Sequence, residues 1–345
     1  MFKHFARVDL KKLVPIAFAI AAALGLYAFR GAIFVSAPLS PEVPASVTFS
    51  HPLTGLPVEV EMKALPQVYA VVIENHPDAQ PLFGLDAAFL VIEAPVEGGI
   101  SRFLAFFHEG QEVDKIGPVR SARPYFVEWA QGMDAMFTHV GGSPAALELI
   151  ASSGVFDLNQ YWHGEKFWRV NGSRQAPHNV FTSTELLAAA WEDAKTRGRA
   201  PTLLYDLWRY ADGGVAVSEY MNEAPEPRID YPGGVYSVWW KYDTEAQRYV
   251  RYQNNRPHTA GDDDAEIHAD QVAVLKTDVR VLDAEGRRDV RTVGEGKGVL
   301  YMGWGGRPIV WKKSSVSKQI KFFEEDGVSE VVLRPGTTWI EVIPD

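Results

Sequence analysis

The chain has 345 residues, of which 46% are apolar and 12% aromatic, so it can bury two ordinary cores. Its net charge of −10 argues against nucleic-acid binding, which needs a basic surface, and the absence of cysteine excludes disulfides, thiol catalysis and iron–sulfur clusters. A metal would therefore need histidine and carboxylate ligands. Because the histidines are scattered and form no HExxH-like motif, we expect neither a metal site nor a cofactor.

The N-terminal segment predicts a membrane anchor. Residues 1–12 are rich in lysine and arginine, and residues 13–29 (LVPIAFAIAAALGLYAF) carry no charge. Such a run is at the short end of what a spanning helix needs, and basic residues before it keep that end in the cytoplasm. We expect a cytoplasmic tail over 1–12, a single transmembrane helix over 13–29 and a proline-containing stalk over 30–50, with the rest extracytoplasmic. A cleaved signal peptide is the alternative, although Pro38 directly follows its candidate cleavage site at residues 35–37.

Residues 51–200 have the pattern of an α/β domain. Four short apolar runs bounded by turn residues predict buried strands: 68–73, 89–92, 103–107 and 135–140. Three helices are expected among and after them. The first begins at Pro124, the second runs from Pro144 to a stop at Gly154, and the third follows the capping sequence at residues 182–185 and ends at Gly198.

Charged side chains lie beside these apolar runs. A buried unpaired charge is strongly disfavoured, so we expect the group to converge on one face of the domain. Its members are Glu93, Glu97, Arg102, Arg120, Arg123 and Ser143, and His139 and His178 are expected within a side chain's reach of them. Three arginines against two glutamates leave one positive charge spare, which would suit an anion resting on the helix start at Gly141-Gly142-Ser143. The alternative is an internal ion network in which the glutamates neutralise the arginines.

A second polar group lies on the loop before the third helix. It consists of Arg174, His178 and Asn179, with Arg169 just upstream. Polar loop residues often bind or react, although this loop could also serve only to hold the helix in place. In an enzymatic interpretation, Glu93 or Glu97 is the general base and His139 or His178 serves the leaving group. Ser143 is expected to be a helix cap rather than a nucleophile, because the G-x-S-x-G pattern is absent.

The character of the sequence changes near residue 200. Residues 201–231 hold several prolines and little periodicity, which predicts a connecting segment. Residues 232–345 contain strand-like runs separated by turn residues, which predicts a β-rich module whose sheet is separate from that of the first domain. Its tryptophans are expected chiefly in the core, with glycan stacking as the alternative. The acidic loop at Asp262-Asp263-Asp264 is expected to be a solvated turn rather than a calcium site.

Six motifs, in order along the chain, resemble those of the YerB-like family. They are IENHPDAQPLFGL (73–85), EAPVEGGISRFLAFF (93–107), IGPVRSARPYF (116–126), HVGGSPAALELI (139–150), RQAPHNVFTS (174–183) and LRPGTTWIEVIP (333–344). The family comprises predicted extracytoplasmic bacterial proteins of undefined biochemical role, so the resemblance implies a location and a two-part architecture but no reaction. The chain departs from the family pattern at Leu82-Phe83, where a polar Gln-Ser pair is usual, and at Ala88, where an Asp is usual. Many relatives are lipoproteins, whereas this chain has no cysteine to take a lipid.

The sequence therefore leaves two alternative functions. In the first, a membrane-anchored envelope protein binds an anionic or glycan-type ligand, or a partner protein, through its arginines. In the second, the same residues serve an envelope phosphotransferase or hydrolase. Binding is favoured, because the sequence contains no catalytic triad, metal motif or nucleotide-binding loop.

Overall fold

The computed structural model describes residues 49–62, 64–172, 174–200, 207–211, 226–231 and 236–345. The predicted cytoplasmic tail, transmembrane helix and stalk up to residue 48 lie outside these residues, and so does most of the predicted connecting segment. Among the described residues, no helix is both long and apolar enough to span a membrane.

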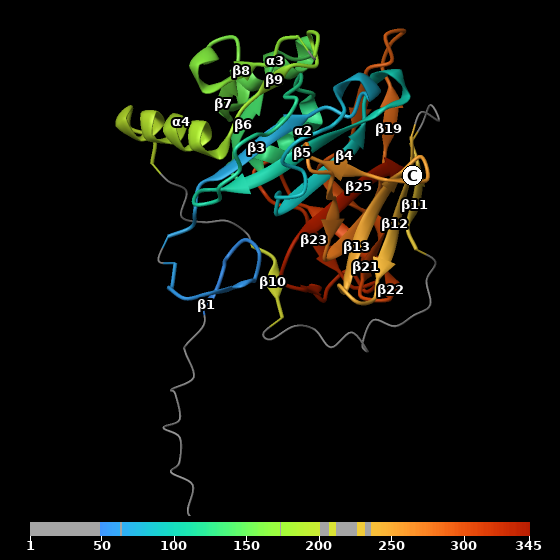
Figure 1. Ribbon diagram of the computed structural model, residues 1–345. Coiled ribbons are helices and arrows are strands. Elements are labelled where there is room, and N and C mark those ends of the chain that lie inside the picture. The colour runs from blue at the N-terminus through green and yellow to red at the C-terminus, as the bar shows by residue number, and fades with distance from the viewer. Residues whose placement is uncertain (1–48, 63, 173, 201–206, 212–225, 232–235) are drawn as a thin grey trace, which may run out of the picture. The chain divides into compact units, whose positions relative to one another are not determined.

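A ten-stranded sheet runs through both regions of the chain (Figure 1). In spatial order its strands are β23 (Lys321–Phe323), β22 (Gly305–Lys313), β21 (Gly294–Met302), β18 (Gln271–Thr277), β25 (Thr338–Pro344), β4 (Leu90–Pro95), β5 (Ser101–His108), β3 (Val68–Ile73), β6 (Met136–His139) and β7 (Phe156–Asn159). Strand β25, from the C-terminal region, lies between β18 and β4 and is parallel to both. The expectation of a separate sheet in each region is therefore wrong. Local patterns identify strands, but the partners of a strand are selected by packing with distant residues.

The N-terminal region is a mixed α/β arrangement, as the sequence predicts. The four apolar runs form β3, β4, β5 and β6, whose residues are buried almost throughout. The three expected helices are α2 (Pro124–Gln131), α3 (Pro144–Ser153) and α4 (Thr184–Thr196). The cap of α3 is confirmed, because the Ser143 hydroxyl accepts a hydrogen bond from the Ala146 N–H at 3.3 Å.

The C-terminal region is rich in strands, as predicted. A small sheet is formed by β11 (Arg228–Asp230), β12 (Ser237–Asp243), β13 (Arg248–Gln253), β14 (Arg256–Pro257) and β17 (His268–Ala269). Short strand pairs complete this part of the chain: β10 (Arg209–Tyr210) with β24 (Val332–Leu333), β15 (Thr259–Ala260) with β16 (Ala265–Glu266), and β19 (Val279–Val281) with β20 (Arg288–Val290). The N-terminal region adds the pairs β1 (Phe49–Ser50) with β2 (Pro57–Val58) and β8 (Trp168–Arg169) with β9 (Val180–Phe181), and the 3-10 helices η1 (Pro77–Ala79), η2 (Glu97–Gly99) and η3 (Gly164–Lys166).

The two faces of the large sheet carry separate cores. Successive side chains of a strand point to opposite faces, so neighbouring positions of β5 diverge. Leu104 belongs to the core that includes α2, whereas Phe103 belongs to the core that includes α4 and the small sheet. On this second face, Trp240 of the small sheet meets Trp339 of β25 edge-on, with ring centroids 4.9 Å apart.

Candidate functional site

The charged residues expected to converge are divided between the two faces of the sheet. Glu93 pairs in register with Phe103, and Arg102 pairs with Ala94, one position further along. Because side chains alternate between faces, Glu93 points into the core of α4 and the small sheet, and Arg102 points to the side of α2. The expectation that Glu93 neutralises one of the arginines is therefore wrong.

Arg102, Arg120 and Arg123 do lie together, and we call them the arginine cluster. The Arg102 Nη1 donates to the carbonyl oxygen of Ser121 at 2.9 Å. Ser121 lies between Arg120 and Arg123 in the sequence. Their positive charges also act on Arg102, since both contribute to lowering its pKa. The prediction that these three side chains converge thus agrees with the geometry.

Two stretches of backbone hold this cluster beside the start of α3. The Ala122 N–H donates to the Gly141 carbonyl at 2.9 Å, and the Ser143 N–H donates to the Ala122 carbonyl at 3.2 Å. Ser143 therefore lies next to the arginine cluster, as expected. Its hydroxyl is occupied as the cap of α3, so it is a structural neighbour of the site and not a free nucleophile.

Two members of the cluster have carboxylate partners. Arg123 donates from Nε and Nη2 to the two oxygens of Glu97, at 2.7 and 2.5 Å. Burial would raise the pKa of Glu97, but the hydrogen bonds and charge of Arg123 outweigh it and lower that pKa. Arg120 Nε lies 2.7 Å from Glu74 Oε1, although its N–H is not aligned on that oxygen, so the contact is an ion pair rather than a hydrogen bond.

Arg102 has no carboxylate partner among the described residues. It is buried, only 4% exposed, and its Nε has no hydrogen-bond acceptor within the described part of the chain. Burial, followed by the charges of Arg123 and Arg120, lowers the pKa of Arg102 to about 10. Glu74 and Glu97 together carry two negative charges and the three arginines carry three positive charges. The cluster therefore has one positive charge that these carboxylates do not neutralise.

Glu74 is a site residue that the sequence reasoning missed. Its carboxylate is buried and has two partners, because Oε1 faces Arg120 and Oε2 accepts a hydrogen bond from His178 Nδ1 at 2.7 Å. The available signal was its position directly after β3, since polar groups that bind ligands gather at the carboxyl ends of strands in α/β sheets. Through Glu74, the predicted loop residue His178 is joined to the arginine cluster.

His139, Arg174 and Asn179 have contacts that hold the fold together. His139 is buried, with Nδ1 2.6 Å from the Gly141 carbonyl and Nε2 2.7 Å from Asp157 Oδ1, so neither nitrogen is free to act as a base. Arg174 donates to two backbone carbonyls of the loop after η1, at 2.5 Å each. The Asn179 side chain accepts from Arg169 at 3.0 Å. These residues were predicted as ligand groups, and the structure gives them local partners instead.

Glu93 belongs to a separate polar group that we call the Glu93 network. Both of its oxygens accept from Arg251 Nη2 at 2.9 Å, and Ser101 donates to Oε1 at 2.5 Å. Neither Glu93 nor Arg251 is exposed at all. Gln253 and Asn75 extend the network, since Arg251 Nη1 donates to Gln253, which exchanges hydrogen bonds with Asn75.

Glu341 lies beside this network in register with Glu93. Its two oxygens accept hydrogen bonds from Trp240 Nε1 at 2.8 Å and from Tyr231 Oη at 2.5 Å. Burial, and then the neighbouring charge of Glu93, raise the pKa of Glu341 to about 8. The raised pKa favours the protonated form of Glu341, in which the carboxyl proton is donated to Tyr231 Oη and the Tyr231 hydrogen turns to the Glu93 carbonyl, 3.3 Å away. In that form the charges of Glu93 and Arg251 balance each other.

The exposed ring of Tyr161 lies over Gly141, beside the backbone that holds the arginine cluster, and the exposed Trp162 follows it in the sequence. Tyr161 is 66% and Trp162 77% exposed. The ring of Tyr161 covers Gly141, where an added Cβ would come within 2.8 Å of it and where φ is +58°.

In the C-terminal region, Trp240, Trp311 and Trp339 are core residues, as expected, whereas Trp304 is exposed.

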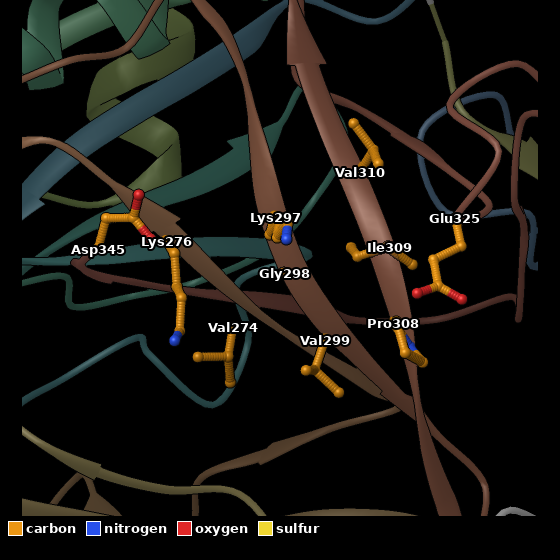
Figure 2. A pocket seen from close by; sticks show the side chains of 10 residues that line it. All are labelled: Val274, Lys276, Lys297, Gly298, Val299, Pro308, Ile309, Val310, Glu325 and Asp345. Atoms are coloured by element: carbon orange, nitrogen blue, oxygen red, sulfur yellow. The ribbon is translucent and has the colours of Figure 1, made fainter.

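A further cavity lies away from the arginine cluster. Its volume is about 550 Å³, and it opens on strands β18, β21 and β22 (Figure 2). Val274, Val299 and Pro308 supply an apolar floor, while Lys276 and Lys297 carry the positive charge, as Figure 2 shows. None of its lining residues belongs to the arginine cluster.

Comparisons with known proteins agree with this architecture. Residues 53–197 match the model described as "Protein of unknown function (DUF3048) N-terminal domain", and residues 228–340 match the corresponding C-terminal domain. A protein of Bacillus subtilis (strain 168) described as "Putative lipoprotein YerB" is 34% identical over 299 residues, covering 85% of this chain and 86% of that protein. The crystal structure of YerB protein from Bacillus subtilis matches with a TM-score of 0.74 and 31% identity, covering 86% of this chain and 97% of that one.

Proposed function

Because the chain belongs to the YerB-like family of DUF3048 proteins, we propose that it is an extracytoplasmic cell-envelope protein that binds an anionic ligand at its arginine cluster. The observation that carries this proposal is the buried guanidinium of Arg102, which has no carboxylate partner among the described residues. Burying an unpaired charge costs several kcal/mol, roughly, so such a group is retained where an anion completes it.

The setting of the cluster supports the same proposal. The backbone around Gly141 and Ser143 brings the start of α3 next to the arginines, and N–H groups at a helix start attract negative charge. Tyr161 and Trp162 add exposed flat apolar surface at the same edge of the sheet. A phosphorylated or carboxylated sugar combines the two properties, because it offers an anion and an apolar ring face.

The location is proposed from the relative and from the N-terminal sequence. The Bacillus subtilis relative is described as "Putative lipoprotein YerB", and a lipid anchor would hold such a protein on a membrane. This chain has no cysteine to carry such a lipid, and residues 13–29 would provide an apolar helix in its place. The single-pass topology, with the bulk of the chain extracytoplasmic, remains a prediction.

Binding is better supported than chemistry. Glu97 is held by Arg123, His139 by Asp157 and Gly141, and His178 by Glu74. Glu93 lies in the Glu93 network on the other face of the sheet. The four residues considered for proton transfer are therefore already engaged with the protein, and none is poised over the arginine cluster as a free base.

A thermal-shift titration tests the proposal. The full-length chain is heated with increasing inorganic phosphate, or glucose 6-phosphate, against sodium chloride at equal ionic strength. An anion that binds only the folded state raises the Tm with concentration. We expect this rise in the wild type and its loss in Arg102→Met.

Arg248→Met is the matched control, because Arg248 is a partly exposed arginine that lies 4.0 Å from Glu266, far along the chain from the cluster. It should keep the phosphate-dependent rise in Tm. Equal rises in wild type and Arg102→Met would show that the ions bind elsewhere and would remove the proposed function.

A further inference from the structure

We propose that His76, Asp78 and His178 form a binding site for a borderline divalent cation of the Zn²⁺ class. One ligand atom from each of the three residues can be chosen so that all lie within 4.8 Å of one another. Two imidazoles and one carboxylate are the donor set that zinc accepts in three-ligand protein sites. This site goes beyond the proposed anion binding and does not depend on it.

His178 is oriented for this role by a buried carboxylate. Its Nδ1 lies 2.7 Å from Glu74 Oε2, and a carboxylate only accepts, so Nδ1 carries a proton, and Nε2 is the atom that the neutral imidazole offers to a metal ion. Histidines that bind metals commonly donate their other N–H to such an acceptor, which fixes the tautomer and the ring direction. Glu74 is itself anchored by Arg120, and only 1% of its side chain is exposed.

His76 and Asp78 are brought together by the 3-10 helix η1. His76 is its N-cap, and Nδ1 accepts from the Asp78 N–H at 3.2 Å, so this nitrogen carries a lone pair, and a metal ion bound there would replace the long capping hydrogen bond. The same nitrogen lies 3.7 Å from Asp78 Oδ2. Arg174 fixes the segment after η1 by donating to the carbonyls of Ala79 and Pro81, which keeps the pair in position.

The two histidines meet although they are distant in sequence. Their rings are stacked, with centroids 4.9 Å apart and planes inclined by 25°. His178 is 16% exposed, His76 39% and Asp78 74%, so a hydrated ion can reach the site, and the two outer side chains have room to rotate onto it. Because Arg120 offsets Glu74, Asp78 supplies the net negative charge that a cation needs.

Three protein ligands leave coordination positions open for water or for a ligand anion. The two nitrogen donors disfavour Ca²⁺ and Mg²⁺, which prefer oxygen ligands. The expected order of affinity is therefore Zn²⁺ well above Ca²⁺ and Mg²⁺.

Calorimetric titration of the untagged full-length chain, after removal of metal by a chelator, tests this site. Wild type should bind Zn²⁺, and His76→Ala and Asp78→Asn should each weaken binding by about tenfold or more, since even residues behind the ligands change metal affinity by about 10–100-fold. In the Co²⁺-loaded protein, the visible absorption bands should shift in His76→Ala, because the number of nitrogen ligands changes. Both variants alter partly exposed side chains, so unchanged urea unfolding curves would show that they remain folded.

His163 provides a matched control. It is the N-cap of η3 and lies 3.9 Å from Glu165, which repeats the spacing of His76 and Asp78, but the described residues place no second histidine with this pair. His163→Ala should bind Zn²⁺ as the wild type does. Absence of Zn²⁺ binding in the wild type, or equal losses in His163→Ala and His76→Ala, would overturn the site. Arg102→Met separates the two proposals, because it should lose the phosphate response and keep Zn²⁺ binding.

Discussion

The arginine cluster and the Glu93 network lie on opposite faces of one sheet and are built from the same residue types, but they differ in how completely their charges are paired. In the Glu93 network, Arg251 and Glu93 are wholly buried and share two hydrogen bonds of 2.9 Å. In the arginine cluster, Arg102 has two arginines as neighbours and no carboxylate of its own among the described residues. Burial alone therefore does not decide whether an arginine has a carboxylate partner, because Arg251 and Arg102 are both buried and only Arg251 has one among the described residues.

The largest difference between the two groups should appear when an arginine is removed from each. Arg251→Met leaves Glu93 buried without its cation, so the free energy of unfolding should fall by about 3–5 kcal/mol. Arg102→Met removes a buried charge that has no carboxylate partner among the described residues, so it should leave stability nearly unchanged or raise it, even though the hydrogen bond to the Ser121 carbonyl is lost. Urea denaturation of both variants at pH 7 measures the two changes.

A double variant sharpens this comparison. Glu93→Gln combined with Arg251→Met removes both charges, so it should be more stable than Arg251→Met alone. Equal losses of free energy in Arg251→Met and Arg102→Met would mean that the two arginines are held in the same way, and the distinction between the groups would disappear.

Glu341 should make one contribution to the pH dependence of stability, opposite in sign to that of His51, His108 and His258, whose pKa values are lowered by burial. Below the ordinary glutamate range, Glu341 is protonated in the folded and the unfolded chain, so it adds no pH dependence. Between that range and the folded pKa of about 8, only the folded chain holds the proton. For this group the unfolded state then binds fewer protons, so the contribution of Glu341 to the free energy of unfolding should fall as the pH rises to about 8, by on the order of a few kcal/mol.

Glu341→Gln tests this assignment. An amide keeps a side chain of the same shape but does not titrate, so the variant should lose this part of the pH dependence. Urea denaturation between pH 5 and 8 compares the two slopes (about 3 pH units that span most of the expected change). A variant with the slope of the wild type would assign the titration to another group.

Much of the local structure could be predicted from the sequence, and the partners of the buried charges could not. Apolar runs and capping residues are local signals, so β3 and the start of α3 at Ser143 were placed correctly. Arg251 and Glu93 are 158 positions apart, and no local pattern links them. The predicted pairing of Glu93 with nearby arginines was based on closeness in sequence. Which residues meet is instead decided by the face of the sheet to which each side chain points, and this face alternates along a strand.

In the candidate site, too, local features could be predicted from the sequence and contacts between distant residues could not. The convergence of Arg102, Arg120 and Arg123 was predicted from their positions near buried strands. The predicted charge count used Glu93 as one of the two neutralising carboxylates, and Glu93 pairs with Arg251 instead. The identity of the second neutralising carboxylate did not follow, because Glu74 meets Arg120 only through the fold. The sequence shows His76 and Asp78 as neighbours, but His178 reaches them from a loop that lies a hundred positions later.

Within the arginine cluster, Arg123→Lys should have a smaller effect on stability than the variants above. Lysine keeps the charge but offers no two-pronged contact to Glu97, and the pair is partly exposed, so the loss should be about 1 kcal/mol or less. The phosphate-dependent rise in Tm should shrink more clearly. A large loss of stability with an unchanged phosphate response would make Arg123 purely structural.

Trp162→Ala should change stability least. The side chain is 77% exposed, so the free energy of unfolding should stay within about 0.5 kcal/mol of the wild type. If the exposed rings contact a sugar, affinity for glucose 6-phosphate should fall while affinity for inorganic phosphate is kept. Isothermal titration with both compounds distinguishes these outcomes, and equal affinities for the sugar phosphate would exclude Trp162 from the binding surface.

Because β25 is the last strand in the sequence and lies inside the sheet, the sheet can be completed only after the whole chain has been synthesised. The ribosome makes β4 and β18 before Thr338–Pro344. Until β25 pairs with them, one edge of each strand has unpaired backbone N–H and carbonyl groups. Each part of the sheet is then open to pairing with another chain, and such edges are prone to aggregation. A nascent chain interrupted before Thr338 would carry two such edges, and we expect it to be a substrate for chaperones and proteases rather than a functional fragment.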